Sequence, residues 1–435
     1  MVFTARNSLC VLIPVLLLGC VVGQVGRELA PPGPLDHWPT DGWQISTPEA
    51  QGMDSELLAQ AVEFALEEDF SVHSLLVVRN GYLVADAYFY PFAADTKHDL
   101  ASCTKSVSST LVGIAIDQGF IESVEEPVLG FFPERSVANL DDGRKAITLE
   151  DLLTMWNGWA GESRDGEVTL CQMMASPDWT RFVLDLPMIE EPGTRFEYCS
   201  GGSHLLSVII RQATGMSALA FARKNLFDPL GIREVEWPRD PQGIDNRGWG
   251  DLRMKPHDMA KLGLLYLNGG QWDGEQLLSA NYVAAATSGH ARVGGRGFFD
   301  AYGYQWWVSS KGFYSARGRG GQYIFVAPAQ NMVVVLTGGE ALLRLGADIA
   351  LADSEGVELP IGLDGAYRIA PGRFGIPAAL KGWWERDDLF VVNMNEIGNI
   401  NHWRIEVAFQ GDEVEVSMQD ATGLGGAEFG GRLGE

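Results

Sequence analysis

A serine and a lysine with a spacing of three could form an activated nucleophile in this chain. Ser102 and Lys105 open a segment in which apolar and small residues run from Val107 to Ile116, before a stop at Gly119. On a helix, residues with this spacing share one face, so the two side chains can meet. Burial disfavours the charged form of an amine, and a neutral amine can take the serine proton. The pattern therefore predicts a nucleophilic Ser102 with Lys105 as its base.

The same spacing also fits a helix N-cap serine followed by a solvated lysine. The setting favours chemistry, because the helix that would start at Ser102 is almost wholly apolar and leaves little room for a solvated Lys105. Two further segments could complete a site. Tyr198 precedes an apolar helix, where a tyrosine is commonly a packing residue. The glycines before Gln322 either mark a tight strand entry or let a ligand approach a backbone N–H.

Taken in order, these segments resemble the serine β-lactamase and penicillin-binding superfamily. The resemblance is to its class C-like branch of DD-peptidases, carboxylesterases and 6-aminohexanoate-oligomer hydrolases, and it runs from about Asp54 to Gly339. The segment Ser102–Lys105 matches Ser-x-Thr-Lys. Two segments depart from the family pattern: Tyr198-Cys199-Ser200 stands for Tyr-x-Asn, and Arg319-Gly320-Gly321 stands for Lys/His-Thr/Ser/Ala-Gly. The segments Gly248–Gly250 and Tyr302–Trp307 look like family segments that line the cleft.

The resemblance implies an α+β sandwich, in which an antiparallel sheet is flanked by helices and carries a mostly helical insert. Ser102 would attack a carbonyl carbon, and Lys105 and Tyr198 would share the proton transfers. The backbone N–H groups of Ser102 and Gln322 would form the oxyanion hole, where one preorganised donor is worth about 3 kcal/mol of barrier. The residues expected to contact substrate are Ser200, Arg319, Gly320, Gly321, Trp156, Trp249 and Trp306.

The two departures bear on the substrate. Ser200 lacks the amide of the usual asparagine, whereas Arg319 is a permanent planar cation that suits a carboxylate. We therefore expect a serine hydrolase acting on small esters or amides, in an aromatic cleft. A DD-carboxypeptidase that acts on cell-wall peptide, or a weak β-lactamase, is the alternative. A binding protein without turnover is a second alternative, which the intact Ser102, Lys105 and Tyr198 disfavour.

Periodicity in the rest of the chain predicts the elements that position these residues. Helical spacing follows Asp54, and two β-rich runs on either side of Asn80-Gly81 predict a hairpin. Residues 118–196 read as a mostly helical insert. Further helices are expected at 203–213, 218–227 and 256–267, and strands at 304–309, 322–327 and 332–337. Alternating apolar residues after 362 predict a small antiparallel β-module.

The N-terminal segment has the pattern of an export signal. One charge, Arg6, precedes an apolar run that is too short to span a bilayer and ends in Leu17-Leu18-Gly19-Cys20. This resembles a bacterial lipoprotein signal, with Cys20 as the lipidated residue, although an ordinary cleaved signal or an anchor also fits. The expected division is signal 1–19, linker 20–44, hydrolase domain 45–361 and β-module 362–435. The mature protein would then be periplasmic or on the cell surface, touching the membrane only through its lipid.

Composition excludes several classes of partner. The net charge of −25 repels nucleic acid and anionic lipid headgroups. The cysteine and histidine spacings support no metal site, and no cofactor is expected. The sequence leaves the oligomeric state open. Cys103 and Cys199 directly follow the predicted nucleophile and tyrosine, so they either form a disulfide or remain buried thiols, with Cys171 as another thiol or an alternative partner.

Overall fold

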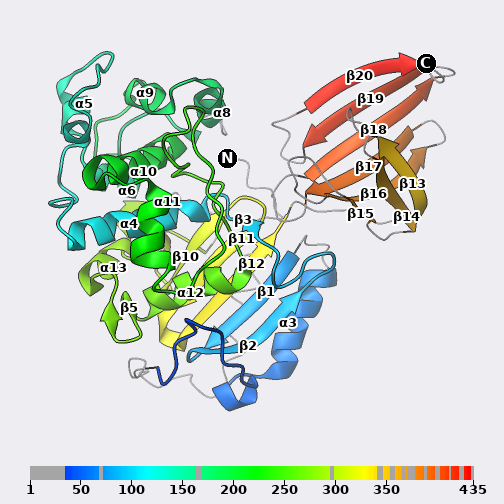
Figure 1. Ribbon diagram of the computed structural model, residues 1–435, viewed down its shortest axis with the longest axis horizontal. Coiled ribbons are helices and arrows are strands. Elements are labelled where there is room, and N and C mark those ends of the chain that lie inside the picture. Colours follow the sequence, from blue (N-terminus) through cyan, green and yellow to red (C-terminus); the bar gives the residue numbers. More distant parts are fainter. Residues whose placement is uncertain are drawn as a thin grey trace.

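The computed structural model describes residues 35–67, 72–162, 168–293 and 298–339, and beyond these the strands between Gly346 and Arg432. Within these residues the chain forms two eight-stranded sheets, besides short strand pairs. Helices surround the first sheet, and the second sheet is a separate layer of strands (Figure 1). The expected signal segment, Cys20 and most of the linker lie outside the described residues.

The first sheet has the strand order β2-β1-β12-β11-β10-β9-β8-β7, and all its neighbours are antiparallel. Its strands are β1 Val72–Arg79, β2 Tyr82–Tyr88, β7 Ala291–Arg292, β8 Ala301–Tyr302, β9 Trp307–Ser309, β10 Phe313–Gly318, β11 Gln322–Ala327 and β12 Met332–Gly338. The predicted hairpin is confirmed. Asn80 and Gly81 have φ values of 53° and 84°, the left-handed conformation that a tight two-residue hairpin turn requires.

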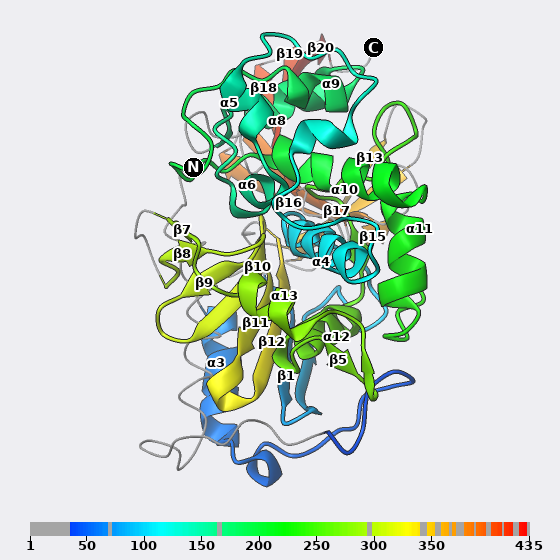
Figure 2. The ribbon, with the colours of Figure 1, turned by 90° about the vertical axis from the view of Figure 1, so that its left-hand side faces the viewer.

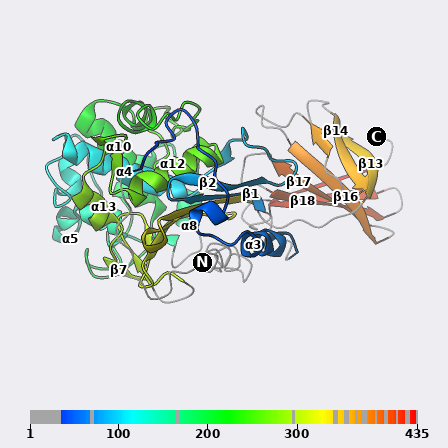
Figure 3. The ribbon, with the colours of Figure 1, turned by 90° about the horizontal axis from the view of Figure 1, so that it is seen from below.

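The central strand β12 is buried along its whole length because both faces of the sheet are covered. Val333 and Val335 belong to the core cluster shared with α4 (Cys103–Asp117) and α12 (Pro256–Leu267). The alternate residues Val334 and Leu336 belong to the cluster on the other face, together with Leu58 of α3 (Ser55–Glu67). Figure 3 shows α3 and α12 on opposite faces of β1 and β2. This double burial explains why β12 reads as a continuous apolar run.

A helical layer covers the α4 side of the sheet (Figure 2). It contains α5 Asp142–Ala146, α6 Leu149–Thr154, α8 Val168–Ala175, α9 Trp179–Leu184, α10 Ser200–Thr214, α11 Ala218–Ala222 and α13 Ala280–Ala286. The insert is helical as predicted. The helix predicted at 218–227 is α11 continued by one π-helical turn at Arg223–Phe227. Among the described residues no single helix is long and apolar enough to cross a membrane; only α10 and the 218–227 helix, bent by 73°, pass such a test as a pair.

The strands of the first sheet between residues 291 and 318 differ from the prediction. The strand expected at 304–309 begins only at Trp307, because Gln305 is left-handed with a φ of 62° and breaks the extended backbone. The strand β10, which lies between β11 and β9 and ends at Gly318, was not predicted. Its sequence ends in a glycine-rich turn, which hides the strand signal in the preceding residues.

The second sheet begins earlier than predicted. Its strands are β13 Gly346–Ala352, β14 Glu358–Asp364, β15 Arg368–Ala370, β16 Ala378–Arg386, β17 Leu389–Glu396, β18 His402–Gln410, β19 Glu413–Asp420 and β20 Gly426–Arg432. The boundary expected at 362 therefore falls inside β14. The sheet also departs from a purely antiparallel module, since β14 pairs parallel with β16. The alternating runs around 403–409 and 414–418 correspond to β18 and β19.

Candidate active site

The helix α4 begins in a turn that fixes its first residues. Ala101 has a φ of 45°, which is unfavourable for a residue with a side chain, and its N–H donates to Asp99 Oδ1 at 2.7 Å. Ser102 follows as the half-buried N-cap of α4. Burial and the negative charge of Asp251 raise the pKa of Asp99 to about 7. The positive charges of Arg253 and Arg319 partly offset this rise. A strained residue directly before the predicted nucleophile is common at functional sites.

Lys105 lies one helical turn after Ser102, and two hydrogen bonds fix the position of its amine. Its Nζ donates to Ser102 Oγ at 2.8 Å and to the carbonyl oxygen of Trp249 at 2.8 Å. The side chain is 1% exposed. The structure therefore brings together the serine and lysine that their spacing had paired, and it rules out the alternative of a solvated lysine.

Tyr198 lies on the other side of this amine. Lys105 Nζ is 5.0 Å from the centroid of the Tyr198 ring, within the range of a cation–π contact. The ring is buried and stacks on Trp307, with centroids 6.1 Å apart and an interplanar angle of 24°. Arg317 covers Trp307 at 4.9 Å. Ser102, Lys105 and Tyr198 thus form one cluster, drawn from α4 and from the segment before α10.

The turn between β10 and β11 lies against the start of α4. A Cβ atom on Gly318 would come within 2.3 Å of the carbonyl oxygen of Leu100, so only glycine allows this approach. Gly320 and Gly321 are left-handed, with φ values of 76° and 90°, and Gln322 then starts β11 opposite Gly318. The glycines and Gln322 are therefore placed beside the Ser102 turn, and Arg319 is half-buried between them.

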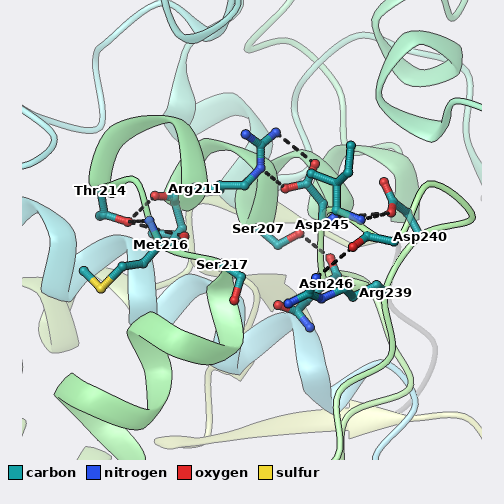
Figure 4. A network of polar contacts seen from close by, with 12 residues as sticks. Ser207, Arg211, Thr214, Met216, Ser217, Arg239, Asp240, Asp245 and Asn246 are labelled. Carbon is teal, nitrogen blue, oxygen red and sulfur yellow. Dashed lines mark hydrogen bonds and ion pairs between the residues drawn. The ribbon is translucent and has the colours of Figure 1, made fainter.

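The segment that carries Trp249 is held against α10 by a polar network, shown in Figure 4. Arg211 Nε donates to Asp245 Oδ1 at 2.6 Å, and Ser207 Oγ donates to the carbonyl oxygen of Asn246 at 2.5 Å. Ser108 of α4 donates to the carbonyl oxygen of Gly248 at 2.8 Å. These contacts fix the backbone on both sides of Asn246 and so aim the Trp249 carbonyl at Lys105.

The predicted tryptophans differ in what they can reach. Trp156 is half-buried, and Trp249 is 9% exposed and contributes its carbonyl oxygen to Lys105. Trp306 is a correction: its ring is 1% exposed and packs against Tyr266 and Tyr314, with centroids at 4.4 and 5.5 Å, so it belongs to the core. Its neighbour Trp307 faces the site instead, because consecutive residues at a strand start point to opposite sides.

Two buried polar residues at the site were not predicted. Glu162 is 1% exposed and accepts the N–H of Ser200. Gln305 donates from Nε2 to the carbonyl oxygens of Leu152 and Leu153 at 2.9 and 2.8 Å, and it accepts from Ser203 Oγ at 2.7 Å. Gln305 thereby joins α6 to α10. In the sequence, Gln305 could have been noticed as a polar side chain surrounded by the aromatic residues of the segment 302–307.

Of the two alternatives left open for Cys103 and Cys199, the structure contains buried thiols and not a disulfide. Cys103, Cys171 and Cys199 are free cysteines. Cys103 Sγ donates to the carbonyl oxygen of Gln322 at 3.4 Å, whereas Cys199 Sγ accepts from the N–H of Gly202. Burial raises the pKa of both thiols, so they act as small apolar fillers. In the described part of the chain no group of three or more His, Cys, Asp or Glu side chains is arranged to hold a metal ion.

A comparison with protein families identifies this architecture. The family model described as Beta-lactamase matches residues 56–338. The chain belongs to the beta-lactamase family. The chain is 26% identical over 298 residues to a 6-aminohexanoate-dimer hydrolase of Paenarthrobacter ureafaciens, and the match covers 62% of this chain and 72% of the relative. The chain is thus a serine hydrolase of the beta-lactamase family.

Solved structures show the same fold at lower identity. An octameric penicillin-binding protein homologue from Pyrococcus abyssi is 18% identical, with a TM-score of 0.54 over 83% of this chain and 97% of that chain. A family VIII carboxylesterase is 16% identical, with a TM-score of 0.54 over 69% of this chain and 94% of that chain.

Proposed function

We propose that this beta-lactamase family member hydrolyses esters or small linear amides through an acyl-enzyme on Ser102. The observation that carries the proposal is the buried Lys105 amine, 2.8 Å from Ser102 Oγ and 5.0 Å from the centroid of the Tyr198 ring. A hydroxyl within hydrogen-bond reach of a buried amine is the geometry of an activated nucleophile. Tyr198 completes a route by which a proton can reach a leaving group.

The reaction would proceed in two steps, acylation of Ser102 and hydrolysis of the acyl-enzyme. As Ser102 Oγ bonds to the carbonyl carbon, its proton passes to Lys105 Nζ, and the leaving alcohol or amine departs with a proton delivered through Tyr198. Water then attacks the acyl ester, which breaks the bond to Oγ and releases a carboxylic acid, and the serine regains its proton. We assign the oxyanion hole to the backbone N–H groups of Ser102 and Gln322, on the support of the glycine-mediated approach of β10 to the Ser102 turn.

The substrate class is inferred from the residues around this cluster. Trp307 and Tyr302 meet the Tyr198 ring, which offers an apolar aromatic wall. Arg319 supplies a cation for a substrate carboxylate, and Ser200 offers less hydrogen bonding to an amide than asparagine would. The related 6-aminohexanoate-dimer hydrolase and the carboxylesterase fold support linear amides and esters as substrates.

A fluorophosphonate probe and a substrate panel test this proposal. We expect the probe to label wild-type protein and not Ser102→Ala, which should fold normally because the Ser102 side chain makes no capping hydrogen bond to α4. The panel compares p-nitrophenyl esters and the 6-aminohexanoate dimer with nitrocefin and D-Ala-D-Ala peptides. Turnover of the first pair supports the proposal, whereas turnover of only the second pair would replace it with a carboxypeptidase or weak β-lactamase. No labelling and no turnover would favour a binding protein.

The alternative of a DD-carboxypeptidase or weak β-lactamase is favoured by one observation. Arg319 is half-buried in the β10–β11 turn, and its positive charge acts on Asp99, three residues before Ser102. Such a cation could meet the carboxylate that both cell-wall peptides and β-lactams carry. Labelling by fluorescent penicillin would support this alternative.

We also propose that residues 1–19 direct export and that Cys20 is lipidated. The support is the apolar run that ends in Leu17-Leu18-Gly19-Cys20. Membrane association and incorporation of labelled palmitate are expected in a bacterial host, and both should be lost in Cys20→Ala. Palmitate labelling that persists in Cys20→Ala would contradict the assignment.

A further inference from the structure

A buried carboxylate faces the predicted active site from the helical insert. Glu162 is 1% exposed. The backbone N–H of Ser200 donates to both of its carboxyl oxygens, each 3.0 Å from the Ser200 nitrogen. The backbone N–H of Glu162 donates to the carbonyl oxygen of Tyr198 at 2.7 Å. Glu162 therefore binds both ends of the short segment that carries Tyr198.

The backbone next to Glu162 is equally close to this segment. A Cβ atom on Gly161 would lie 2.3 Å from the Tyr198 carbonyl oxygen, so the two chains touch at a glycine. Neither chain can shift far without breaking the Glu162 contacts. The place of the Tyr198 ring beside the Lys105 amine, 5.0 Å from its centroid, therefore depends on the insert.

The charge of Glu162 also acts on the site. Burial raises the pKa of its carboxyl group to about 7, and the opposite charge of Lys105 works against that rise. The other titratable groups near this carboxylate come from the segment before α10: the Cys199 thiol, whose pKa burial and the charges of Glu162 and Glu197 raise, and Tyr198, whose carbonyl oxygen accepts from the N–H of Glu162. Lys105 is the cation that acts on Glu162, and it comes from α4.

We propose that Glu162 is a positioning residue for the hydrolytic reaction. Its carboxyl group holds the Tyr198–Ser200 segment beside the Lys105 amine by accepting the N–H of Ser200, and its backbone N–H holds the carbonyl oxygen of Tyr198. The inference rests on the proposed function, because it assumes that Tyr198 transfers a proton beside Lys105. A carboxyl group whose pKa is about 7 can accept the N–H of Ser200 in either protonation state, since an acceptor oxygen remains when it is protonated.

Two substitutions separate holding from charge. Glu162→Gln keeps the size of the side chain and an oxygen that can accept from Ser200, but it removes the charge. Glu162→Asp keeps the charge but shortens the reach to Ser200. The matched control is Asp258→Asn: Asp258 is another buried carboxylate, 3.7 Å from the amine of Lys261 within α12 and outside the predicted site.

The readout is the rate of fluorophosphonate labelling of Ser102 as a function of pH, together with kcat/KM on the best ester. In Glu162→Gln we expect both profiles to match wild type, because an oxygen that can accept from Ser200 is kept. In Glu162→Asp we expect the rate to fall about tenfold across the profile, because the Tyr198 segment is less well held. Asp258→Asn should match the wild-type profile.

Each outcome decides a separate point. A Glu162→Gln variant that loses as much rate as Glu162→Asp would overturn the holding role, while labelling of wild-type protein would leave the proposed function standing. If Glu162→Gln does not fold, Glu162→Asp still decides the holding role, since full wild-type rates at every pH would overturn it. Wild-type protein that never reacts with the probe would refute the proposed function itself. A rate loss in Asp258→Asn equal to that in Glu162→Asp would show a general effect of changing a buried carboxylate and refute the assignment to Glu162.

Discussion

Replacing Lys105 with methionine should separate its role in catalysis from its role in folding. Methionine has a similar length and an unbranched chain, so it can fill the buried volume without a cavity. The loss of the amine leaves the carbonyl oxygen of Trp249 without its 2.8 Å donor, which costs about 1–3 kcal/mol. Against this, the variant no longer buries an amine in a site that is 1% exposed, and burying a polar group is itself costly. The two effects oppose each other, so we expect the free energy of unfolding to change by less than about 2 kcal/mol.

The activity of Lys105→Met should respond far more strongly. A positioned general base contributes about 10²–10⁴ in rate, so kcat/KM on a p-nitrophenyl ester should fall by that factor. Urea unfolding followed by circular dichroism measures the stability, and steady-state kinetics measure the rate. The matched control is Lys261→Met, which removes a buried lysine from α12 and leaves the Asp258 carboxylate, 3.7 Å away, without that partner. That control should lose stability and keep its rate. If Lys105→Met kept more than about a tenth of the wild-type rate, its assignment as the base would be wrong.

Three further perturbations have defined outcomes. Tyr198→Phe should lower kcat by on the order of a hundredfold with little change in stability, and an unchanged pH–rate profile would remove the phenol from the mechanism. Gly318→Ala places a Cβ atom 2.3 Å from the Leu100 carbonyl oxygen and must displace the Ser102 turn, so a loss of about 1–3 kcal/mol in stability and at least about tenfold in labelling rate is expected; wild-type values for both would contradict the close approach. Burial lowers the pKa of His204 to about 4 in the folded protein, below its value in the unfolded chain. As the pH falls below about 6.5, the unfolded chain therefore binds a proton that the folded chain does not, and the folded state loses stability. The stability lost between pH 7 and pH 5 should be about 2 kcal/mol smaller in His204→Gln than in wild type, as measured by urea unfolding at each pH, and an equal loss would show that His204 is not a buried neutral group.

The elements that were predicted well carry their signal in local sequence. The helix expected at 256–267 is α12 with the same bounds, because Pro256 fits the first helical turn and the apolar residues behind it are continuous. The strand expected at 322–327 is β11 for a similar reason. Gln305 shows the limit: its left-handed backbone follows from contacts with α6 and α10, and no local pattern encodes them.

In the candidate site, too, features fixed by local sequence were predicted and features fixed by distant contacts were not. Ser102 and Lys105 were paired correctly because they lie on one helix, where spacing alone fixes the geometry. The choice of Trp306 over Trp307 failed because a shift of one residue reverses the face of a strand, and the strand start was misplaced. Glu162 could not be found from spacing, since its partner Ser200 is distant in the sequence and an acidic residue is ordinarily a surface residue.

The pairing of β1 with β12 has a consequence for how the chain is made. These two strands are hydrogen-bonded neighbours, the second and third in the order of the first sheet, with Val77 opposite Val334. One is near the start of the fold in the sequence, and the other is the last strand of that sheet. A ribosome must therefore release nearly the whole hydrolase fold before β1 finds its second neighbour. Until then the apolar edge of the β1–β2 hairpin is open to other strands, which is the state that aggregates most readily and that chaperones protect.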